Sequence, residues 1–145
     1  MMSQLPRRLR PDPLPEVSKL LSPIRDGFLH LHKALIDRER AMYEVGHGAI
    51  PNNAHFLQLL LNDPFFAWLR PFGQFVVQID EALETEVPLS LVGAHALLDQ
   101  ARGLLRSSES GNSAEQRYYA ALQGNDQIVL LHADLKRQLN NAGSQ

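Results

Sequence analysis

Apolar residues recur every three or four positions along most of this chain, which is the spacing of an amphipathic α-helix. The first stripe follows Ser22 and Pro23, a pair that suits the N-cap and first turn of a helix. Gly46 or Gly48 is expected to end the helix, because glycine readily takes the left-handed conformation. The stripe consists of Ile24, Phe28, Leu31, Leu35 and Met42. The pattern therefore predicts a long helix over residues 22–48.

Capping residues and prolines divide the next part of the chain. One of the two asparagines at 52–53 can cap a short helix that carries several leucines. Asp63 and Pro64 form a second cap and first-turn pair. Pro71 would interrupt a helix begun at Pro64, because proline removes a backbone hydrogen bond and clashes with the preceding turn. Residues 64–69 are therefore predicted to form either a separate turn or the kinked start of a helix.

Two further stripes follow Pro71. The first predicts a helix that ends near Thr85, with Pro88 enforcing the stop, and Ser90 can cap the second. The second helix is expected to end at the serine- and glycine-rich residues 107–112. The stripes are Phe72, Phe75, Val76, Ile79 and Leu83, and then Leu91, Ala94, Leu97, Leu98, Ala101 and Leu105.

A capping box is expected at the start of the last helix, where Gln116 follows Ser113 by three residues. Apolar residues then continue at helical spacing as far as Leu139. Gly124 lies inside this stripe and is expected to weaken the helix without breaking it. The pattern therefore predicts one continuous final helix.

The fold class that follows is all-α, because no segment alternates apolar and polar residues as a half-buried strand does. Amphipathic helices joined by short polar connections bury their stripes most simply as an antiparallel bundle. We expect four main helices plus a short one within a single domain over residues 15–142. Residues 1–14, which contain several prolines and arginines, are predicted to form an extended arm.

Six of the ten aromatic residues gather between positions 56 and 75, with Pro64 and Pro71 among them. Aromatic side chains dominate both cores and interfaces, so this segment is either the centre of the core or a surface that meets a partner. Side chains this close in sequence point in several directions, and an arginine beside a tryptophan is typical of interfaces. The candidate interaction surface is Phe65, Phe66, Trp68, Arg70 and Phe72.

Composition narrows the function classes. The 145 residues carry a net charge of −2 and no cysteine, so disulfides and thiolate chemistry are excluded. The near-neutral charge argues against nucleic acid as a partner, although the arginines of residues 1–14 could contact phosphates. Apolar runs are far shorter than the ~20 residues of a membrane span. We expect a soluble cytoplasmic protein that binds no membrane.

Histidine and carboxylate residues offer only a loose metal site. Glu44 and His47 have the spacing of a di-iron motif, but they occur once and at the end of a helix. A composite set could come from two helix faces, with members spaced four or seven residues apart. This candidate metal site is His32, Glu39, His95 and Asp99. Its alternative is a set of ordinary surface ion pairs.

The sequence contains no recognisable catalytic motif, such as a nucleophile elbow or a phosphate-binding glycine-rich loop. The leading hypothesis is a small non-catalytic helical protein that acts by protein–protein association, most simply as a homodimer. The alternative is a helical bundle that binds a metal or a small ligand. No cofactor is strongly indicated.

Overall fold

The computed structural model describes residues 15–84 and 89–143, and all the regular structure within these ranges is helical. The all-α class is therefore confirmed for the described part of the chain. The predicted arm at residues 1–14 lies outside it, as does the predicted stop at Pro88. The elements are α1 (Pro15–His47), α2 (Asn53–Asn62), the 3₁₀ helix η3 (Pro64–Leu69), α3 (Arg70–Glu84), α4 (Leu91–Leu104), α5 (Ser113–Gln123) and α6 (Asp126–Gly143).

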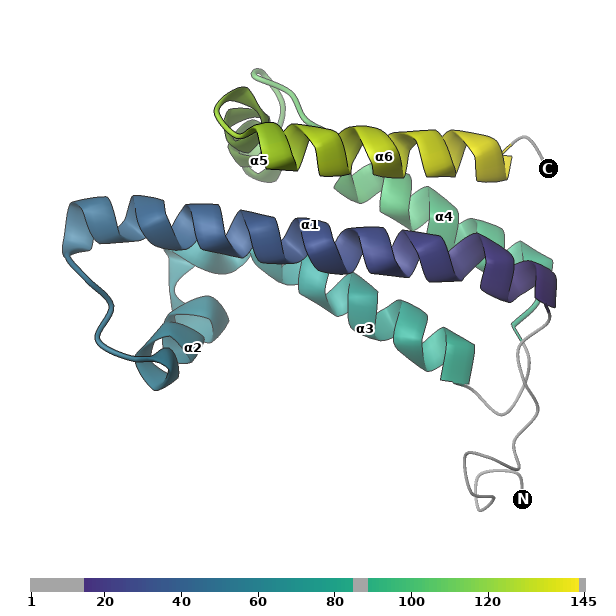
Figure 1. Ribbon diagram of the computed structural model, residues 1–145, viewed down its shortest axis with the longest axis horizontal. Coiled ribbons are helices and arrows are strands. Elements are labelled where there is room, and N and C mark those ends of the chain that lie inside the picture. The colour runs from purple at the N-terminus through teal and green to yellow at the C-terminus, as the bar shows by residue number, and fades with distance from the viewer. Residues whose placement is uncertain (1–14, 85–88, 144–145) are drawn as a thin grey trace, which may run out of the picture.

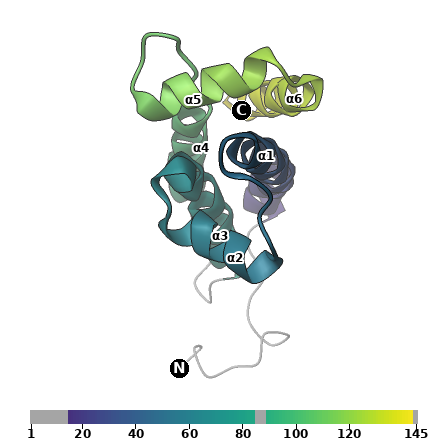
Figure 2. The same cartoon turned by 90° about the vertical axis from the view of Figure 1, so that its left-hand side faces the viewer.

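The long helix α1 runs the length of the molecule, with α6 antiparallel on one side and α3 on the other (Figure 1). Seen from its C-terminal end, α1 lies between α6 and the pair formed by α2 and α3 (Figure 2). Gly27 permits the close packing of α1 on α6, because a Cβ at this position would lie 2.5 Å from Cδ2 of Leu135. The helix α1 is thus the common support of the other elements.

The start of α1 differs from the prediction. The helix begins at Pro15 rather than Ser22, and Pro23 lies inside it. Proline suits the first position of a helix, where the missing N–H has no intrahelical partner. The added turns place Val17 and Leu21 in the core with no exposed surface. Burial of these side chains therefore outweighs the hydrogen bond that Pro23 removes.

Replacing Pro23 with alanine is expected to stabilise the fold by about 2 kcal/mol. Alanine restores the missing backbone donor and removes the ring clash, while the unfolded chain gains a little entropy. Pro23 is exposed, so the change leaves core packing intact. Urea unfolding followed by circular dichroism measures the effect. An unchanged or lower midpoint would contradict this account of α1.

Local capping signals are confirmed in the middle of the chain. The side chain of Asn52 accepts the backbone N–H of His55 at 2.8 Å and begins α2. Asp63 accepts the N–H of Phe65 at 2.8 Å and begins η3, which is the separate turn of the two alternatives expected before Pro71. Ser90 likewise caps α4 through the N–H of Gly93.

The prediction of one continuous final helix is wrong, because the chain forms α5 and α6 with Gly124 between them. The capping box of α5 is Asn112 with Glu115, one residue before the expected pair. Asn125 accepts the N–H of Ile128 at 3.0 Å and so supports the first turn of α6. Glycine is a poor helix former and asparagine a good cap, and together they favour two helices over one.

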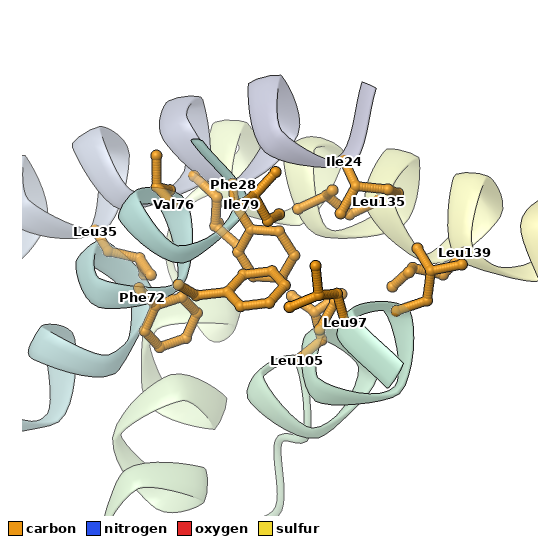
Figure 3. Packing of buried hydrophobic residues seen from close by; sticks show 14 of the residues in the cluster. Ile24, Phe28, Leu35, Phe72, Val76, Ile79, Leu97, Leu105, Leu135 and Leu139 are labelled. Carbon is orange, nitrogen blue, oxygen red and sulfur yellow. The ribbon is translucent and has the colours of Figure 1, made fainter. Parts of the chain in front are cut away.

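The core lies where α1, α3, α4 and α6 meet (Figure 3). Phe28 of α1 is at its centre and packs edge-on against Phe75 with ring centroids 5.0 Å apart. Phe72 contacts the same ring at 6.3 Å. Aliphatic side chains complete the core around these rings, among them Ile24, Leu35, Val76, Ile79, Leu97, Leu105, Leu135 and Leu139.

Candidate functional site

Most of the predicted interaction surface lies in the core. Phe66, Trp68 and Phe72 are buried, whereas Phe65 and Arg70 are half-buried. The tight 3₁₀ turn of η3 points its aromatic side chains toward neighbours on several elements. Phe66 contacts the rings of Tyr43, Phe56 and Phe65, and Trp68 contacts those of Phe72 and Tyr118. Of the five predicted surface residues, Phe66, Trp68 and Phe72 therefore serve the core, and only Phe65 and Arg70 are more than slightly exposed.

Arg70 is occupied by the backbone beside it. Its guanidinium donates to the carbonyl oxygens of Leu60 and Asp63, each at 2.9 Å. These carbonyls belong to the last turn of α2 and the residue after it, where helix C-termini leave acceptors without partners. Arg70 therefore joins the end of α2 to the start of α3.

Glu39, a predicted metal ligand, is the one charged residue in the buried class among the described residues. Its two carboxylate oxygens accept from Arg38 at 2.7 Å and from Arg117 at 3.0 Å. Arg117 also donates to the carbonyl oxygen of Phe65 at 3.1 Å and lies over the ring of that residue. Because both oxygens are held by arginines, Glu39 links α1, α5 and η3 rather than offering a metal ligand.

The other predicted metal ligands are separate from Glu39. Asp99 is exposed and pairs with Arg102 at 2.6 Å, and His95 is half-buried on α4. In residues 15–84 and 89–143, no three histidine, aspartate or glutamate side chains gather as a metal site requires. The four-residue site is therefore not assembled, because spacing along single helices does not determine which helix faces meet.

The pair Glu44 and His47 is also used otherwise. Glu44 accepts the backbone N–H of Ile50 at 2.8 Å, and its other oxygen lies 3.7 Å from Arg40. The ring of His47 stacks on Tyr43 and its Nδ1 lies 3.1 Å from the Tyr43 carbonyl oxygen. These contacts close the end of α1.

An apolar groove lies between α2 and the body of the molecule. Among the described residues it has a volume of about 280 Å³. We call it the α2 groove. Its lining is aliphatic and aromatic apart from His32, Arg70, Gly73 and Gln74. The lining residues are His32, Ile36, Leu57, Leu60, Leu61, Phe66, Leu69, Arg70, Gly73 and Gln74.

The rim of the α2 groove is formed by a helix that has no fully buried residue. None of the ten residues of α2 is buried, although four of them are leucines. Leu57 and Leu61 lie one turn apart on the same face and are 54% and 57% exposed. Figures 1 and 2 show α2 below the C-terminal half of α1, away from α4, α5 and α6. Two large apolar side chains therefore face solvent beside an apolar hollow.

The wall of the groove carries one histidine. His32 is half-buried against Gly73, where a Cβ would lie 3.0 Å from the imidazole Cε1. Burial lowers the pKa of His32 from its ordinary value. Within the described ranges, neither ring nitrogen has a hydrogen-bond partner. The imidazole thus lines an apolar site in which burial disfavours its charged form.

Apolar surface continues from the groove along the contact between α1 and α3. These helices are antiparallel, and their contact passes through Arg25 with Asp80 and through His32 with Gly73. Leu29 and Val77 lie between these two contacts on the same helix faces, and are 43% and 54% exposed. Exposed apolar side chains therefore also occur along the contact between α1 and α3, beyond the lining of the groove.

A polar pair outside the lining of the α2 groove consists of Tyr118 and His132. The hydroxyl of Tyr118 lies 2.7 Å from Nδ1 of His132, which joins α5 to α6. Burial raises the pKa of Tyr118 and lowers that of His132, to which nearby Lys136 adds a further lowering. Because each group satisfies the other within a part-buried contact, the pair has a structural role.

The α2 groove was missed by reasoning from the sequence. The signal was present, because the ten residues of α2 hold four leucines within five positions, more than one helix face can bury. The aromatic side chains at positions 65–75 form a stronger pattern, and the predicted interaction surface was therefore placed on them. Which of the two faces solvent depends on the fold.

The comparisons with known proteins add no further assignment. No protein-family model matches the chain, and neither a curated protein nor a solved structure is found to be similar to it. Among the described helices, none combines the length and apolar character needed to cross a bilayer.

Proposed function

We propose that this chain is a non-catalytic helical protein that acts by self-association through the α2 groove. The observation that carries the proposal is the exposure of Leu57 and Leu61 beside an apolar hollow of about 280 Å³. Contiguous exposed apolar surface is typical of sites that meet another protein. The surface differs from the one expected from the sequence, of which Phe66, Trp68 and Phe72 are buried here.

The occupant that we favour is a second copy of the chain. A two-fold interface brings identical surfaces together, so any charge at its centre meets the same charge. The helix α2 contains no aspartate, glutamate, lysine or arginine, and its exposed leucines match the apolar lining of the groove. A two-fold contact across α2 thus buries the leucines of each copy without like-charge repulsion. The cytoplasm, expected from the sequence, is the proposed location.

Replacing Leu57 and Leu61 together with glutamine is expected to weaken the dimer at least about a hundredfold. Each leucine contributes roughly 1.5–3 kcal/mol when fully buried, and both copies lose two of them. Glutamine keeps a similar length and favours helix, so the monomer fold is retained. Light scattering on a size-exclusion column, over a hundredfold range of protein concentration, measures the dissociation constant.

The matched control replaces Val92 and Leu130 with glutamine. These side chains are 82% and 70% exposed, and they belong to α4 and α6 rather than to the groove. The control is expected to associate like the unmodified chain. A strict monomer at all concentrations of the unmodified chain, or equal effects of the two double variants, would contradict the proposal.

The absence of cysteine allows a direct test of where the copies meet. A single Leu61→Cys substitution places one thiol on the proposed two-fold contact, and mild oxidation is expected to yield a covalent dimer. Val92→Cys, at a more exposed position on α4, is the control and is expected to cross-link much less. Cross-linking through Val92→Cys alone would place the interface elsewhere.

Small-ligand binding, the alternative from the sequence, has one supporting observation in the same groove. Its volume approaches the lower end of ligand pockets, about 300 Å³, and its lining is mainly apolar. A medium-chain alcohol is the simplest probe. A concentration-dependent rise in melting temperature that Leu57→Gln and Leu61→Gln abolish would support this function, and no rise would remove it.

A further inference from the structure

The α2 groove contains very few groups that can carry a charge. Of its lining residues only His32 and Arg70 are titratable, and Arg70 keeps its charge at all ordinary pH values. The Arg70 guanidinium donates to two carbonyl oxygens, which leave its positive charge without a carboxylate partner inside the groove. His32 is therefore the only residue of the groove whose charge changes near neutral pH.

No acidic group faces His32 from the elements packed around it. Neither α2 nor η3 contains an aspartate, glutamate, lysine or arginine, and the one histidine of these two helices is His55, near the start of α2. On α3 the nearest carboxylate on the contact face is that of Asp80, which is bound to Arg25. On α1, the neighbouring Lys33 is paired with Asp37 at 3.0 Å on the exposed side. A proton on His32 would thus find Arg70 but no anion in the groove.

We propose that self-association through the α2 groove is proton-linked at His32 and weakens as the pH falls. This inference rests on the proposed function. A second copy covers the groove and removes the water that now reaches the imidazole. The charged imidazole loses more favourable hydration free energy in that step than the neutral one does, and no carboxylate compensates for the lost water. Covering the groove therefore disfavours the charged form.

The sign follows from proton linkage. Covering the groove lowers the pKa of His32 further, so the dimer holds fewer protons than two free copies. Above the pKa of the free copy, both states are neutral and association is at full strength. As the pH falls through that value, the free copies take up protons and association weakens, by at most about tenfold per pH unit for each histidine.

The dissociation constant of the unmodified chain is therefore expected to rise by more than about threefold as the pH falls from 7.5 to 5, mainly at the acid end of this range, because burial already lowers the pKa of His32 in the free copy. His32→Asn keeps a neutral polar side chain that does not titrate, and its dissociation constant is expected to change less than threefold over the same range. His30→Gln is the matched control, because His30 is exposed on α1 and neither lines the groove nor belongs to α2. It is expected to show the full pH dependence. Far-ultraviolet circular dichroism at both pH values confirms that the copies stay folded.

The outcomes separate this inference from the proposed function. A dimer whose affinity is the same at both pH values would overturn the proton linkage and leave association in place. A pH dependence that persists in His32→Asn would also overturn it, because another group would then carry the proton. A chain that is monomeric at pH 7.5 would overturn the proposed function itself. As an independent readout, NMR titration of the His32 ring is expected to give a lower pKa in the dimer than in the Leu57→Gln, Leu61→Gln variant.

Discussion

Replacing Glu39 with alanine is expected to destabilise the fold by about 3 to 5 kcal/mol, the cost typical of breaking a buried ion pair. Only 1% of Glu39 is exposed, and its carboxylate is held by Arg38 and Arg117. Alanine leaves both guanidinium groups without their anion, in a site that also contains the ring and carbonyl of Phe65. The ion pair that joins Glu39 of α1 to Arg117 of α5 is lost with it.

Urea unfolding followed by circular dichroism measures this effect, with Asp37→Ala as the control. Asp37 forms an exposed pair with Lys33 on the same helix at 3.0 Å, and such pairs contribute at most about 1 kcal/mol. The difference between the two variants isolates burial, because both remove one carboxylate from α1. Equal, small changes in the two variants would show that Glu39 is not a central contact of the fold.

Replacing Trp68 with alanine is expected to cost about 3 to 5 kcal/mol of folding free energy, because a large buried ring is removed. Trp68 is 8% exposed and packs edge-on against Phe72, with ring centroids 6.0 Å apart. The guanidinium of Arg117 also lies over the indole, 5.8 Å from its centroid. From the sequence, this substitution would weaken association while keeping the helices. Because the indole is buried, we instead expect Trp68→Ala to lose its helix content at a lower temperature and a lower denaturant concentration than the unmodified chain.

Trp68→Phe is the informative partner of this variant. The indole Nε1 is buried and has no hydrogen-bond partner within the described residues, so phenylalanine removes volume but no hydrogen bond. Its cost is expected to be under half that of Trp68→Ala, and the unpartnered donor disappears. Thermal and urea unfolding of both variants measure these costs. A stable Trp68→Ala protein with only its association impaired would contradict the core role.

Much of the helix pattern could be predicted from the sequence because it depends on groups close together in the chain. Asn52, Asp63 and Ser90 cap helices through N–H groups two or three residues away. Pro71 separates η3 from α3 for a reason that is also local, because proline removes a backbone hydrogen bond and clashes with the preceding turn. Such signals act before any tertiary contact forms, so a single sequence carries them.

The errors lie where local preference competes with long-range packing. Ser22 and Pro23 resemble a helix start, yet burial of Val17 and Leu21 against other elements extends α1 to Pro15. At Gly124 the poor helix propensity of glycine and the capping preference of Asn125 favour a break. The apolar stripe that spans these residues instead predicts one continuous helix. Periodicity shows which side of a helix is apolar, but it does not show where one helix ends within a shared core.

The candidate site was decided by the tertiary structure alone. Glu39 and Arg117 are 78 residues apart in sequence, and no spacing rule connects them. The aromatic segment announced a large apolar area, but only packing determined that Trp68 faces inward while Leu57 and Leu61 of α2 face solvent. The sequence by itself determined the helices, their caps and the amount of apolar surface to be buried. Which apolar surface stays exposed depends on how the helices meet, since each face can be covered only by contacts between residues far apart in the chain.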